Sequence, residues 1–396
     1  MIHSFPTDRK KMRETLLDAV EAVREVLVAG AAESEEIGTL PEASVDALEQ
    51  AGLLAMKLPA EFGGAEADPV TQLQVIEAVT RIDPSAGWVM MIGAATIASP
   101  AVFLSDEAIE QMFIGGRPPR TAGALMPSGQ AMPVDGGYVV NGRWSFGSGI
   151  KHSQWISAGA LVTSSEGEIL ERLSVVFPTA EAMIHDNWQV GGLKGTGSND
   201  FSVSGLFVPD MFTWRRGSDQ KPRRGGPLYR IGLPGFLAVE HAAFALGVGH
   251  RALEAIIDLA QNKKRGYSTY SNPALLADRS SFQLALGRHD LRLRAARSLA
   301  TAIFEGVWET VCRGGPPTTN EQADMRACGA FATEVAADVA TNAFRYGGGT
   351  ALYSSHILQR CLSDINAAAQ HFMVNDTAYE SHGQLLLGLP DANPMS

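Results

Sequence analysis

The stretch from Gly137 to Gly149 reads Gly-Tyr-Val-Val-Asn-Gly-Arg-Trp-Ser-Phe-Gly-Ser-Gly. Its first residues, Tyr138 to Val140, favour a β-strand, and the dipeptide that follows, Asn141-Gly142, is typical of a turn. Its last residues place Ser148 between two glycines. Glycine lets a bound molecule approach the backbone closely, and a hydroxyl there can donate or accept a hydrogen bond. The stretch therefore predicts a strand that ends in a small polar turn.

The residues around this stretch predict a β domain that covers positions 116–215. Short β-prone runs occur at Trp155 to Val162, Leu173 to Phe177 and Phe201 to Val208, and turn residues separate them. Runs of this length and spacing are typical of an antiparallel barrel or sandwich.

Helical patterns stand on both sides of the β domain. In positions 1–115, Leu16, Val20, Val23 and Leu27 recur at helical spacing. In positions 216–396 we expect a bundle of four long helices: Phe236 to Gln261, Leu275 to Thr310, Thr319 to Arg345, and Leu358 to Leu387. The expected class is α+β, with three domains.

Composition narrows the functions that need to be considered. The 396 residues carry a formal net charge of −11, which argues against a nucleic-acid binder. Three widely spaced cysteines predict neither a disulfide framework nor a metal site, and the scattered histidines show no metal-ligand spacing. A reducing cytoplasm fits this pattern. We expect no window of about 20 apolar residues, and hence no membrane insertion.

Three segments resemble the acyl-CoA dehydrogenase superfamily: Leu58 to Gly64, Gly137 to Phe146, and Tyr346 to Gly349. The resemblance runs almost end to end. It implies an N-terminal helical domain, a central antiparallel β-barrel, a C-terminal four-helix bundle and a homotetramer. Within the superfamily, Trp144 to Gly149 and Asp364 to His371 look like segments of the two-component, reduced-flavin-dependent (group D) monooxygenases or hydroxylases.

This resemblance implies chemistry on a reduced flavin, FADH2 or FMNH2, which a separate flavin reductase delivers. Oxygen would form a C4a-hydroperoxide, and an apolar, cyclic or aromatic small molecule would accept one oxygen atom. Ser148 would form a hydrogen bond with flavin N5. His371 would position or protonate the peroxide, since imidazole titrates near neutral pH.

The resemblance also assigns residues to the cofactor. Trp144, Phe146, Gly147 and Ser148 would line the flavin from the strand, and Thr196 from the polar loop Leu193 to Asp200. Arg279, with Arg265 nearby, lies where the family binds the flavin phosphate with a cation. The glycines Gly347, Gly348 and Gly349 offer free backbone amides for phosphate or adenine, and in the family this turn contacts a cofactor held by a neighbouring subunit.

The substrate residues are expected on the helix that begins near Trp88. Related aromatic hydroxylases carry a histidine there, but Trp88 to Ser99 contains none. Met91 and Thr96 predict an apolar wall instead, and a phenolate held by imidazole is not expected. His152, which follows the Ser148 turn, is placed at the pocket mouth.

Other readings of the same residues stay open. His371 also fits a core histidine, Ser148 a simple barrel turn, and the three glycines a helix break. Glu240, in the helix that opens the last domain, keeps acyl-CoA dehydrogenation open, because some dehydrogenases take their base from that helix. A catalytically idle relative is a third reading.

Overall fold

A computed structural model describes residues 3–164, 168–217, 221–265 and 274–395. The chain forms two compact units. The first consists of Met1–Asp68, Trp88–Val190 and Lys194–Arg230, and the second of Pro69–Gly87, Gly191–Leu193 and Ile231–Ser396. The three domain boundaries given above stay a prediction.

The first unit begins with helices, as the spacing of its apolar residues predicts. Asp8 caps the first helix by accepting a hydrogen bond from the Lys11 amide at 2.9 Å, and Gly38 ends that helix at a φ of 68°. Its buried face contains Leu16, Val20 and Leu27. The helices that lie wholly or mainly in this unit are α1 (Arg9–Ile37), α2 (Glu42–Gln50), α4 (Pro84–Phe103) and α5 (Asp106–Met112).

Helix α4 corrects the expectation about apolar windows. Its 20 residues are long and apolar enough, by length and composition, to cross a bilayer. However, 72% of the qualifying window is buried inside the protein, as in the core helix of a soluble protein. The apolar run therefore reflects core packing.

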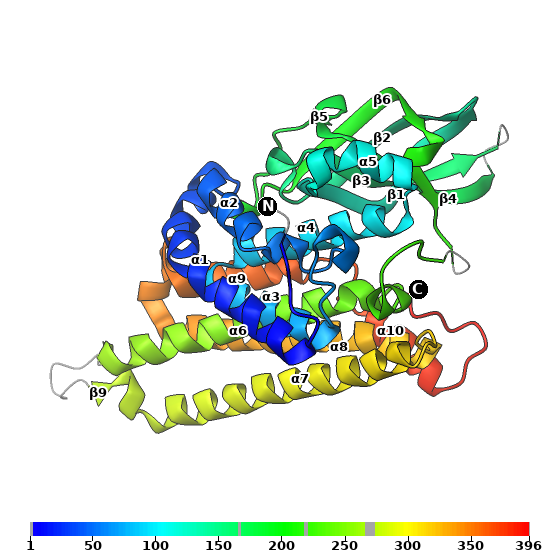
Figure 1. Ribbon diagram of the computed structural model, residues 1–396. Coiled ribbons are helices and arrows are strands. Elements are labelled where there is room, and N and C mark those ends of the chain that lie inside the picture. Colours follow the sequence, from blue (N-terminus) through cyan, green and yellow to red (C-terminus); the bar gives the residue numbers. More distant parts are fainter. Residues whose placement is uncertain (1–2, 165–167, 218–220, 266–273, 396) are drawn as a thin grey trace. The chain divides into compact units, whose positions relative to one another are not determined.

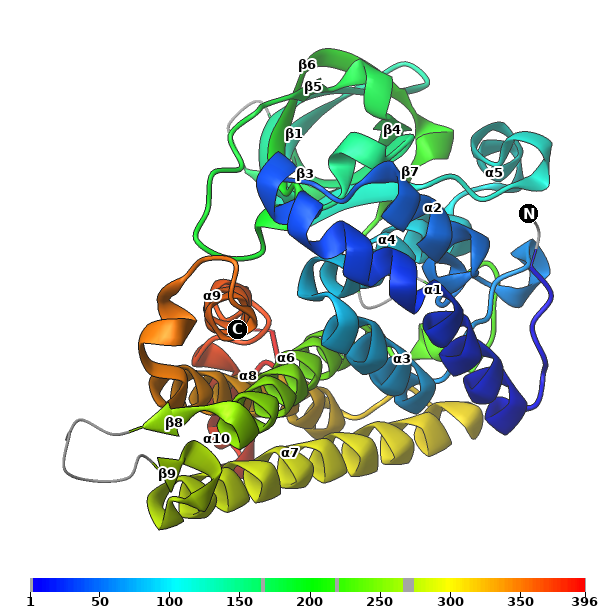
Figure 2. The same ribbon diagram turned by 90° about the vertical axis from the view of Figure 1, so that its left-hand side faces the viewer.

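A curved sheet of seven strands follows the helices (Figure 2). The strands pair in the order β5-β6-β2-β1-β3-β4-β7. They are β1 (Thr121–Val134), β2 (Gly137–Gly147), β3 (Trp155–Thr163), β4 (Ile169–Pro178), β5 (Met183–Ile184), β6 (Asn199–Pro209) and β7 (Thr213–Arg215). The expected antiparallel barrel is wrong in one respect, because β1 and β3 are parallel. The described strands form a mixed sheet with β5 and β7 at its edges.

The longest strand, β1, has no counterpart among the β-prone runs of the sequence. It contains Gly123, Pro127, Gly129 and Pro133, all of which weaken a strand pattern. The pairing with β3 is irregular between Ala124 and Gly129, so Pro127 and Gly129 fall where the ladder is interrupted. Because of these residues, β1 lacks the run of β-prone residues by which a strand is recognised in a sequence.

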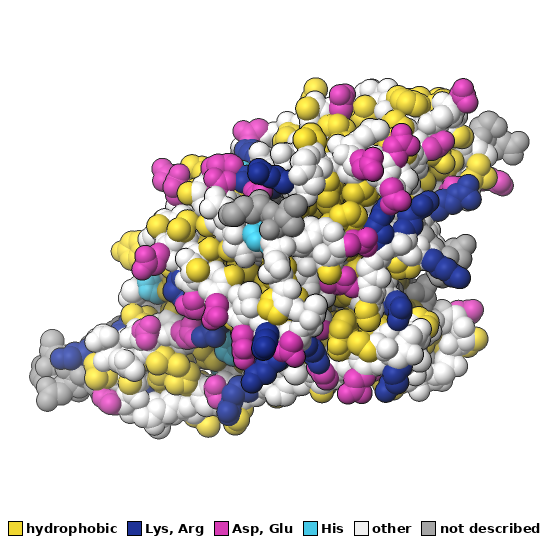
Figure 3. Space-filling model, viewed as in Figure 1, with side chains coloured by type: hydrophobic (Ala, Val, Ile, Leu, Met, Phe, Trp, Pro, Cys, Tyr) yellow, Lys and Arg dark blue, Asp and Glu magenta, His cyan; other side chains and the backbone are white. Residues whose placement is uncertain are grey.

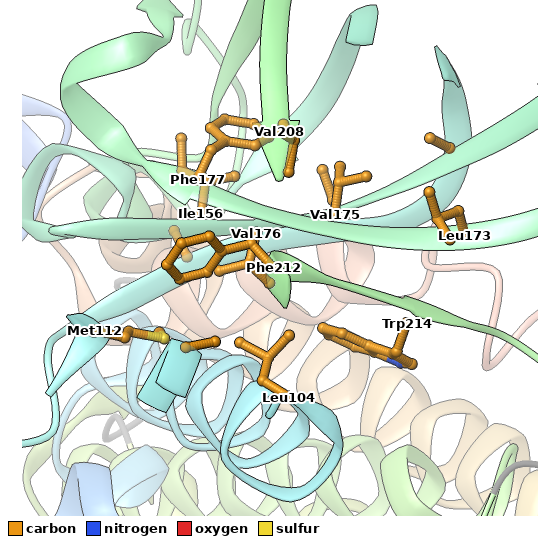
Figure 4. Close-up of a cluster of buried hydrophobic side chains, with 14 of the residues drawn as sticks. Leu104, Met112, Ile156, Leu173, Val175, Val176, Phe177, Val208, Phe212 and Trp214 are labelled. Atoms are coloured by element: carbon orange, nitrogen blue, oxygen red, sulfur yellow. The ribbon is translucent and has the colours of Figure 1, made fainter. Parts of the chain in front are cut away.

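The core of the first unit lies between the sheet and its helices (Figure 4). Leu104, which follows α4, and Met112 of α5 approach Phe212 and the β7 side chain of Trp214 in this view. On β2, Trp144 is fully buried and stacks on Phe201, with ring centroids 5.2 Å apart. Burial of such large side chains is the main source of stability here.

The second unit consists mainly of long helices that pack side by side (Figure 1). They are α3 (Pro69–Ile82), α6 (Gly235–Asn262), α7 (Ser280–Cys312), α8 (Thr319–Gly347), α9 (Ile357–Ala368) and α10 (Thr377–Leu386). A short hairpin of β8 (Lys264–Arg265) and β9 (Ala274–Leu275) precedes α7. Helix α8 starts with a capping box between Thr318 and Glu321.

The expected bundle of four helices is correct for three segments and wrong for the fourth. Residues 358–387 do not form one helix, because α9 ends at Ala368 and α10 starts at Thr377. Helix α7 starts at Ser280 rather than Leu275. The break after Ala368 contains His371, which therefore lies in a turn and not on a helix.

Candidate functional site

Ser148 lies in the first unit, directly after β2 ends at Gly147. Its side chain is 4% exposed. The Ser148 amide donates to Phe146 O at 2.9 Å, and the Gly149 amide donates to Thr196 O at 2.9 Å. Gly149 has a φ of 71°, which L side chains rarely adopt. The glycines therefore allow the tight turn that fixes the serine.

A chain of buried polar groups surrounds the Ser148 hydroxyl. The indole Nε1 of Trp88 donates to Ser148 Oγ at 3.0 Å. Ser148 Oγ lies 2.7 Å from Ser198 Oγ, which lies 2.6 Å from Thr196 Oγ1. The structure thus brings together Trp88, Ser148 and Thr196, three residues that the sequence assigned separately. Sequence reasoning did not single out Ser198, although it lies in the polar loop.

Phe146, two residues before Ser148, forms an aromatic pair with Trp188. Phe146 has a φ of 69°, which is rare for any residue except glycine, and its ring is 69% exposed. Trp188 meets it edge to face, with ring centroids 6.2 Å apart. Strained backbone and exposed aromatic area concentrate at ligand sites. Trp188 was missed in the sequence because no motif marks it.

A cavity of about 60 Å³ opens on the Ser148 turn. Much of its wall is apolar, including Leu54, Leu58, Val89 and Ile97. The wall from α4 matches the expectation of an apolar pocket along that helix. Ser148 and His152 also line the cavity, together with Gly149, Gly93, His3, Val45, Glu49, Ala55, Arg117, Pro118, Pro119, Arg120 and Thr121.

Of the four expected substrate residues, only His152 lines this cavity, and Trp88, Met91 and Thr96 do not. Met91 is fully buried and is not among the residues that line this cavity. Thr96 is also absent from the lining, and its hydroxyl lies 2.8 Å from Thr121 Oγ1 and donates to Ile92 O at 2.9 Å. Thr96 therefore connects α4 to the start of β1.

His152 lies at the cavity rim and is held by the connection between α1 and α2. Its Nε2 lies 2.8 Å from Leu40 O and 3.2 Å from Thr39 Oγ1. Its Nδ1 lies 3.0 Å from a carboxylate oxygen of Glu42. A hydrogen bond from Arg120 lowers the pKa of Glu42. His152 therefore sits in an anchored position beside an ionised carboxylate.

Arg120 joins three carboxylates at the same rim. Its guanidinium pairs with Glu42 at 2.7 Å, with Glu49 at 2.5 Å and with Asp46. These hydrogen bonds outweigh the effect of burial and raise the pKa of Arg120. With Arg117, the rim holds two guanidinium groups and three carboxylates. It does not form a net positive site for an anion.

Two further β2 residues, Trp144 and Gly147, are packed next to the Ser148 turn. The Trp144 indole donates to Gly159 O at 2.7 Å within the core of the sheet. At Gly147, an added Cβ would lie 3.0 Å from Asn199 O and from Ile150 Cδ1, so the backbone is closely packed there. Both residues hold the turn in place through packing.

In the second unit, His371 lies in the turn between α9 and α10. Its ring packs against that of His241 on α6, with centroids 4.2 Å apart. Its Nδ1 accepts a hydrogen bond from the Met373 amide at 3.3 Å. Burial lowers the pKa of His371 to about 4. The ring is therefore neutral near pH 7, and the proton must reside on Nε2. His241 was not identified from the sequence.

Arg326 on α8 holds this turn. The guanidinium donates to Phe372 O at 3.1 Å, Thr377 Oγ1 at 2.7 Å and Pro394 O at 3.0 Å. Burial lowers the pKa of Arg326. Glu240, the alternative base, is fully buried on α6 next to His241.

The predicted phosphate-binding residues lie at one end of the second unit. Gly348 ends α8 with a φ of 56°, and an added Cβ at Gly349 would meet nothing within 4 Å. Lys263 donates to Gly347 O and to Thr350 Oγ1. The Tyr346 hydroxyl donates to Ser281 O at 3.0 Å, which brings the glycine turn to the start of α7. Exposed Arg279 precedes this helix; the Arg265 side chain is outside the described structure.

Two family models match the chain. The acyl-CoA dehydrogenase N-terminal domain matches residues 8–115, and the acyl-CoA dehydrogenase C-terminal domain matches residues 239–376. The matched ranges lie on either side of the sheet along the chain, which agrees with helices before and after a central mixed sheet.

Individual relatives show to which group within this superfamily the chain is most similar. An indole-3-acetate monooxygenase from Pseudomonas putida is 31% identical over 87% of this chain and 86% of its own. The oxygenase subunit HsaA of a flavin-dependent monooxygenase from Rhodococcus jostii is 27% identical, covering 96% of this chain and all of its own. XiaF from Streptomyces, solved with FADH2 and glycerol, has a TM-score of 0.86 and 25% identity over 98% of both chains. This chain therefore belongs to the acyl-CoA dehydrogenase superfamily and, within it, to the flavin-dependent monooxygenases.

Proposed function

We propose that this monooxygenase is the oxygenase component of a two-component system that oxygenates a neutral aromatic molecule. The observation that carries the proposal is the Ser148 turn, where a buried hydroxyl borders a largely apolar cavity and follows Phe146, an exposed aromatic residue that packs against Trp188. Reduced flavin would supply the two electrons that convert O2 into one inserted oxygen atom and one water molecule.

The residues around Ser148 fit a flavin ring. Isoalloxazine is flat, with an apolar benzenoid edge and a polar edge. Phe146 offers an exposed ring, Trp188 a half-buried one, and Ser148 offers a hydroxyl at the adjoining turn. The buried side chain of Ser198 forms a hydrogen bond with this hydroxyl, and buried Thr196 forms one with Ser198. FADH2 and FMNH2 share the same ring, so this part of the site serves either.

The residues proposed for the phosphate end of a cofactor lie in the second unit, where the family resemblance has the glycine turn contact a cofactor held by a neighbouring subunit. Arg279 and Lys263 supply positive charge there, and Gly349 offers open backbone, whereas Gly347 is closely packed. This assignment rests on the resemblance together with the meeting of the α8 end and the α7 start.

His371 is proposed to position the reacting oxygen by a hydrogen bond. Its Nδ1 accepts from the Met373 amide, so the proton of the neutral ring is on Nε2. With a pKa of about 4, it is uncharged at neutral pH and cannot serve there as an imidazolium acid. Of the two roles expected from the sequence, positioning is the better supported.

The substrate proposal follows from the cavity wall and its rim. The wall is largely apolar, which suits an aromatic ring. At the rim, Arg120 is paired with Glu42, Asp46 and Glu49, so its charge is already compensated. A neutral aromatic such as indole should therefore bind better than an aromatic acid such as indole-3-acetate.

Partners and assembly remain part of the proposal. A relative is named as an oxygenase subunit, which supports reduced flavin arriving from a separate reductase. A homotetramer and a cytoplasmic location are proposed on the family resemblance. Acidic and basic side chains both occur across the face shown in Figure 3, and the net charge is −11, so no nucleic-acid partner is proposed. Light scattering of the purified protein tests the tetramer.

The decisive experiment omits the reductase. The purified protein is mixed anaerobically with photoreduced FMN or FAD and indole, then exposed to ¹⁸O2 in the presence of catalase. Mass spectrometry should find one ¹⁸O atom per oxygenated product, and much less product with indole-3-acetate. NADH with oxidised flavin should give none. If a panel of neutral aromatics yields only H2O2 and no labelled product, the proposal is wrong.

A further inference from the structure

Trp88 and Ser148 meet through a hydrogen bond whose direction is fixed. The indole Nε1–H can only donate, so Ser148 Oγ must accept at 3.0 Å. Both side chains are buried, with Trp88 7% and Ser148 4% exposed. One of the two acceptor sites on the serine oxygen is therefore always occupied.

The second partner of Ser148 is Ser198, at 2.7 Å, and either oxygen can donate in this pair. If Ser198 donates, both acceptor sites of Ser148 are filled and its proton has no partner among the described residues. If Ser148 donates, only one acceptor site stays open. A buried donor without a partner is costly, whereas an oxygen with one unused lone pair is common. The second arrangement is therefore favoured.

Two further features favour the same arrangement. Accepting a hydrogen bond from Trp88 polarises the Ser148 hydroxyl and makes it a better donor. Ser198 Oγ lies 2.6 Å from Thr196 Oγ1, so the Ser198 hydroxyl can donate its own hydrogen bond to Thr196. The chain of hydrogen bonds can then run from Trp88 through Ser148 and Ser198 to Thr196.

We infer that Trp88 and Ser198 are positioning residues that orient the Ser148 hydroxyl so that one lone pair faces the ligand and accepts an N–H group. This inference rests on the proposed function, because the ligand is taken to be a flavin. N5 of a reduced flavin carries hydrogen, whereas N5 of an oxidised flavin is a bare acceptor. A lone pair of Ser148 can accept a hydrogen bond from N5–H of the reduced ring, whereas it is repelled by the lone pair on N5 of the oxidised ring. Trp88 therefore sets a preference for the reduced cofactor.

The test compares the Kd of reduced and oxidised FMN and FAD under anaerobic conditions, for wild type and Trp88→Phe. Phenylalanine keeps an aromatic ring and removes the donor. The ratio of oxidised to reduced Kd should fall about fivefold, the factor that about 1 kcal/mol represents. Ser148→Ala should lower the ratio similarly, and the double variant should lower it no further. Trp214→Phe, in the core of the same unit, is the matched control and should leave the ratio unchanged.

Ser198→Ala removes the second hydrogen-bond partner of Ser148. It should lower the ratio as well, Ser198→Thr should restore it, and Ser174→Ala is the control for loss of another buried serine. If the ratio of oxidised to reduced Kd is unchanged in both Trp88→Phe and Ser198→Ala, the inference is wrong. A higher ratio in these variants would also overturn it, because it would mean that Ser148 donates to the ligand. Failure of the wild type to bind either flavin would instead overturn the proposed function.

Discussion

At the scale of single residues, burial decides the state of the imidazole in the second unit. His371 packs against His241 and accepts a backbone hydrogen bond on Nδ1. Burial disfavours its charged form, so the pKa falls from the usual 6.5 to about 4. The same packing that fixes the ring therefore removes its charge at neutral pH.

We predict that the His371 ring titrates near pH 4. Between pH 6.5 and 4, the unfolded chain takes up a proton that the folded protein does not. Stability from this group is therefore full above pH 6.5 and is lost as pH falls through this window. The loss is about 3 kcal/mol at pH 4.5, since each unit of difference between the unfolded and folded pKa corresponds to about 1.36 kcal/mol.

NMR titration measures this pKa directly, with the signal assigned by its absence in His371→Gln. Urea unfolding at pH 7.5 and 4.5 should show a smaller loss for this variant than for wild type. His382→Gln, on α10, controls for loss of an imidazole. A pKa above 6 for His371 would contradict the prediction and would restore its role as an acid.

Asp83 has the opposite pH dependence. It lies before α4, accepts hydrogen bonds from the Ser85 and Ala86 amides, and pairs with Arg360 at 3.6 Å. Burial raises its pKa from 3.8 to about 6, although Arg360 and Arg251 oppose the shift. The folded protein therefore holds this proton more tightly, so stability from this group is full below pH 3.8 and is lost as pH rises through 6.

Asp83→Asn should remove that dependence while keeping a capping side chain. Relative to wild type, the variant should gain about 2 kcal/mol of unfolding free energy between pH 4.5 and 7.5. Urea unfolding at both pH values measures the difference. An equal effect of the substitution at both values would show that Asp83 stays ionised throughout.

From the sequence, single residues could be selected only where local chemistry marks the position. Ser148 is recognisable because glycines flank it, and Thr196 because its loop is rich in small polar residues. Ser198, Trp188 and His241 gain their significance only from partners distant in the chain. Met91 and Thr96 share a helix with Trp88, but the direction of each side chain depends on packing that periodicity alone did not resolve.

At the scale of elements, Arg326 connects α8 to the turn that carries His371. Its guanidinium donates to Phe372 O, Thr377 Oγ1 and Pro394 O. A sequence gives little sign of such a role, because most arginines are solvated. The same turn explains why the fourth predicted helix is two helices: residues 369–376 form turns that pack against other side chains.

We predict that Arg326→Met destabilises the protein by about 3 kcal/mol, because three part-buried acceptors lose their donor. Hydrogen exchange should accelerate at residues 371–377, while the β-sheet amides should keep their protection. Arg313→Met, on the exposed end of α7, is the control. Unchanged exchange in this turn would show that packing alone holds it.

At the scale of the whole molecule, the order of helices, sheet and helices was predictable because hydrophobic periodicity changes twice along the chain. The strand order was not, because the parallel pairing of β1 with β3 joins strands that are separated by β2 in the sequence. Pattern analysis also missed β1 itself, in which glycine and proline interrupt the ladder.

A ligand that binds only the folded protein must stabilise it, and reduced flavin should do so more than oxidised flavin. At a concentration one hundred times its Kd, a ligand adds about 2.7 kcal/mol to the unfolding free energy. For a chain of 396 residues, this raises the unfolding midpoint by about 3 °C. Anaerobic thermal unfolding with dithionite-reduced FMN and FAD measures the rise, with dithionite alone as the control. At equal concentrations, oxidised flavin should give a smaller rise, because its N5 offers no hydrogen to the serine lone pair. Equal rises for the two redox states would mean that the polar turn at Ser148 does not distinguish them, and the preference would then have to arise in the reductase.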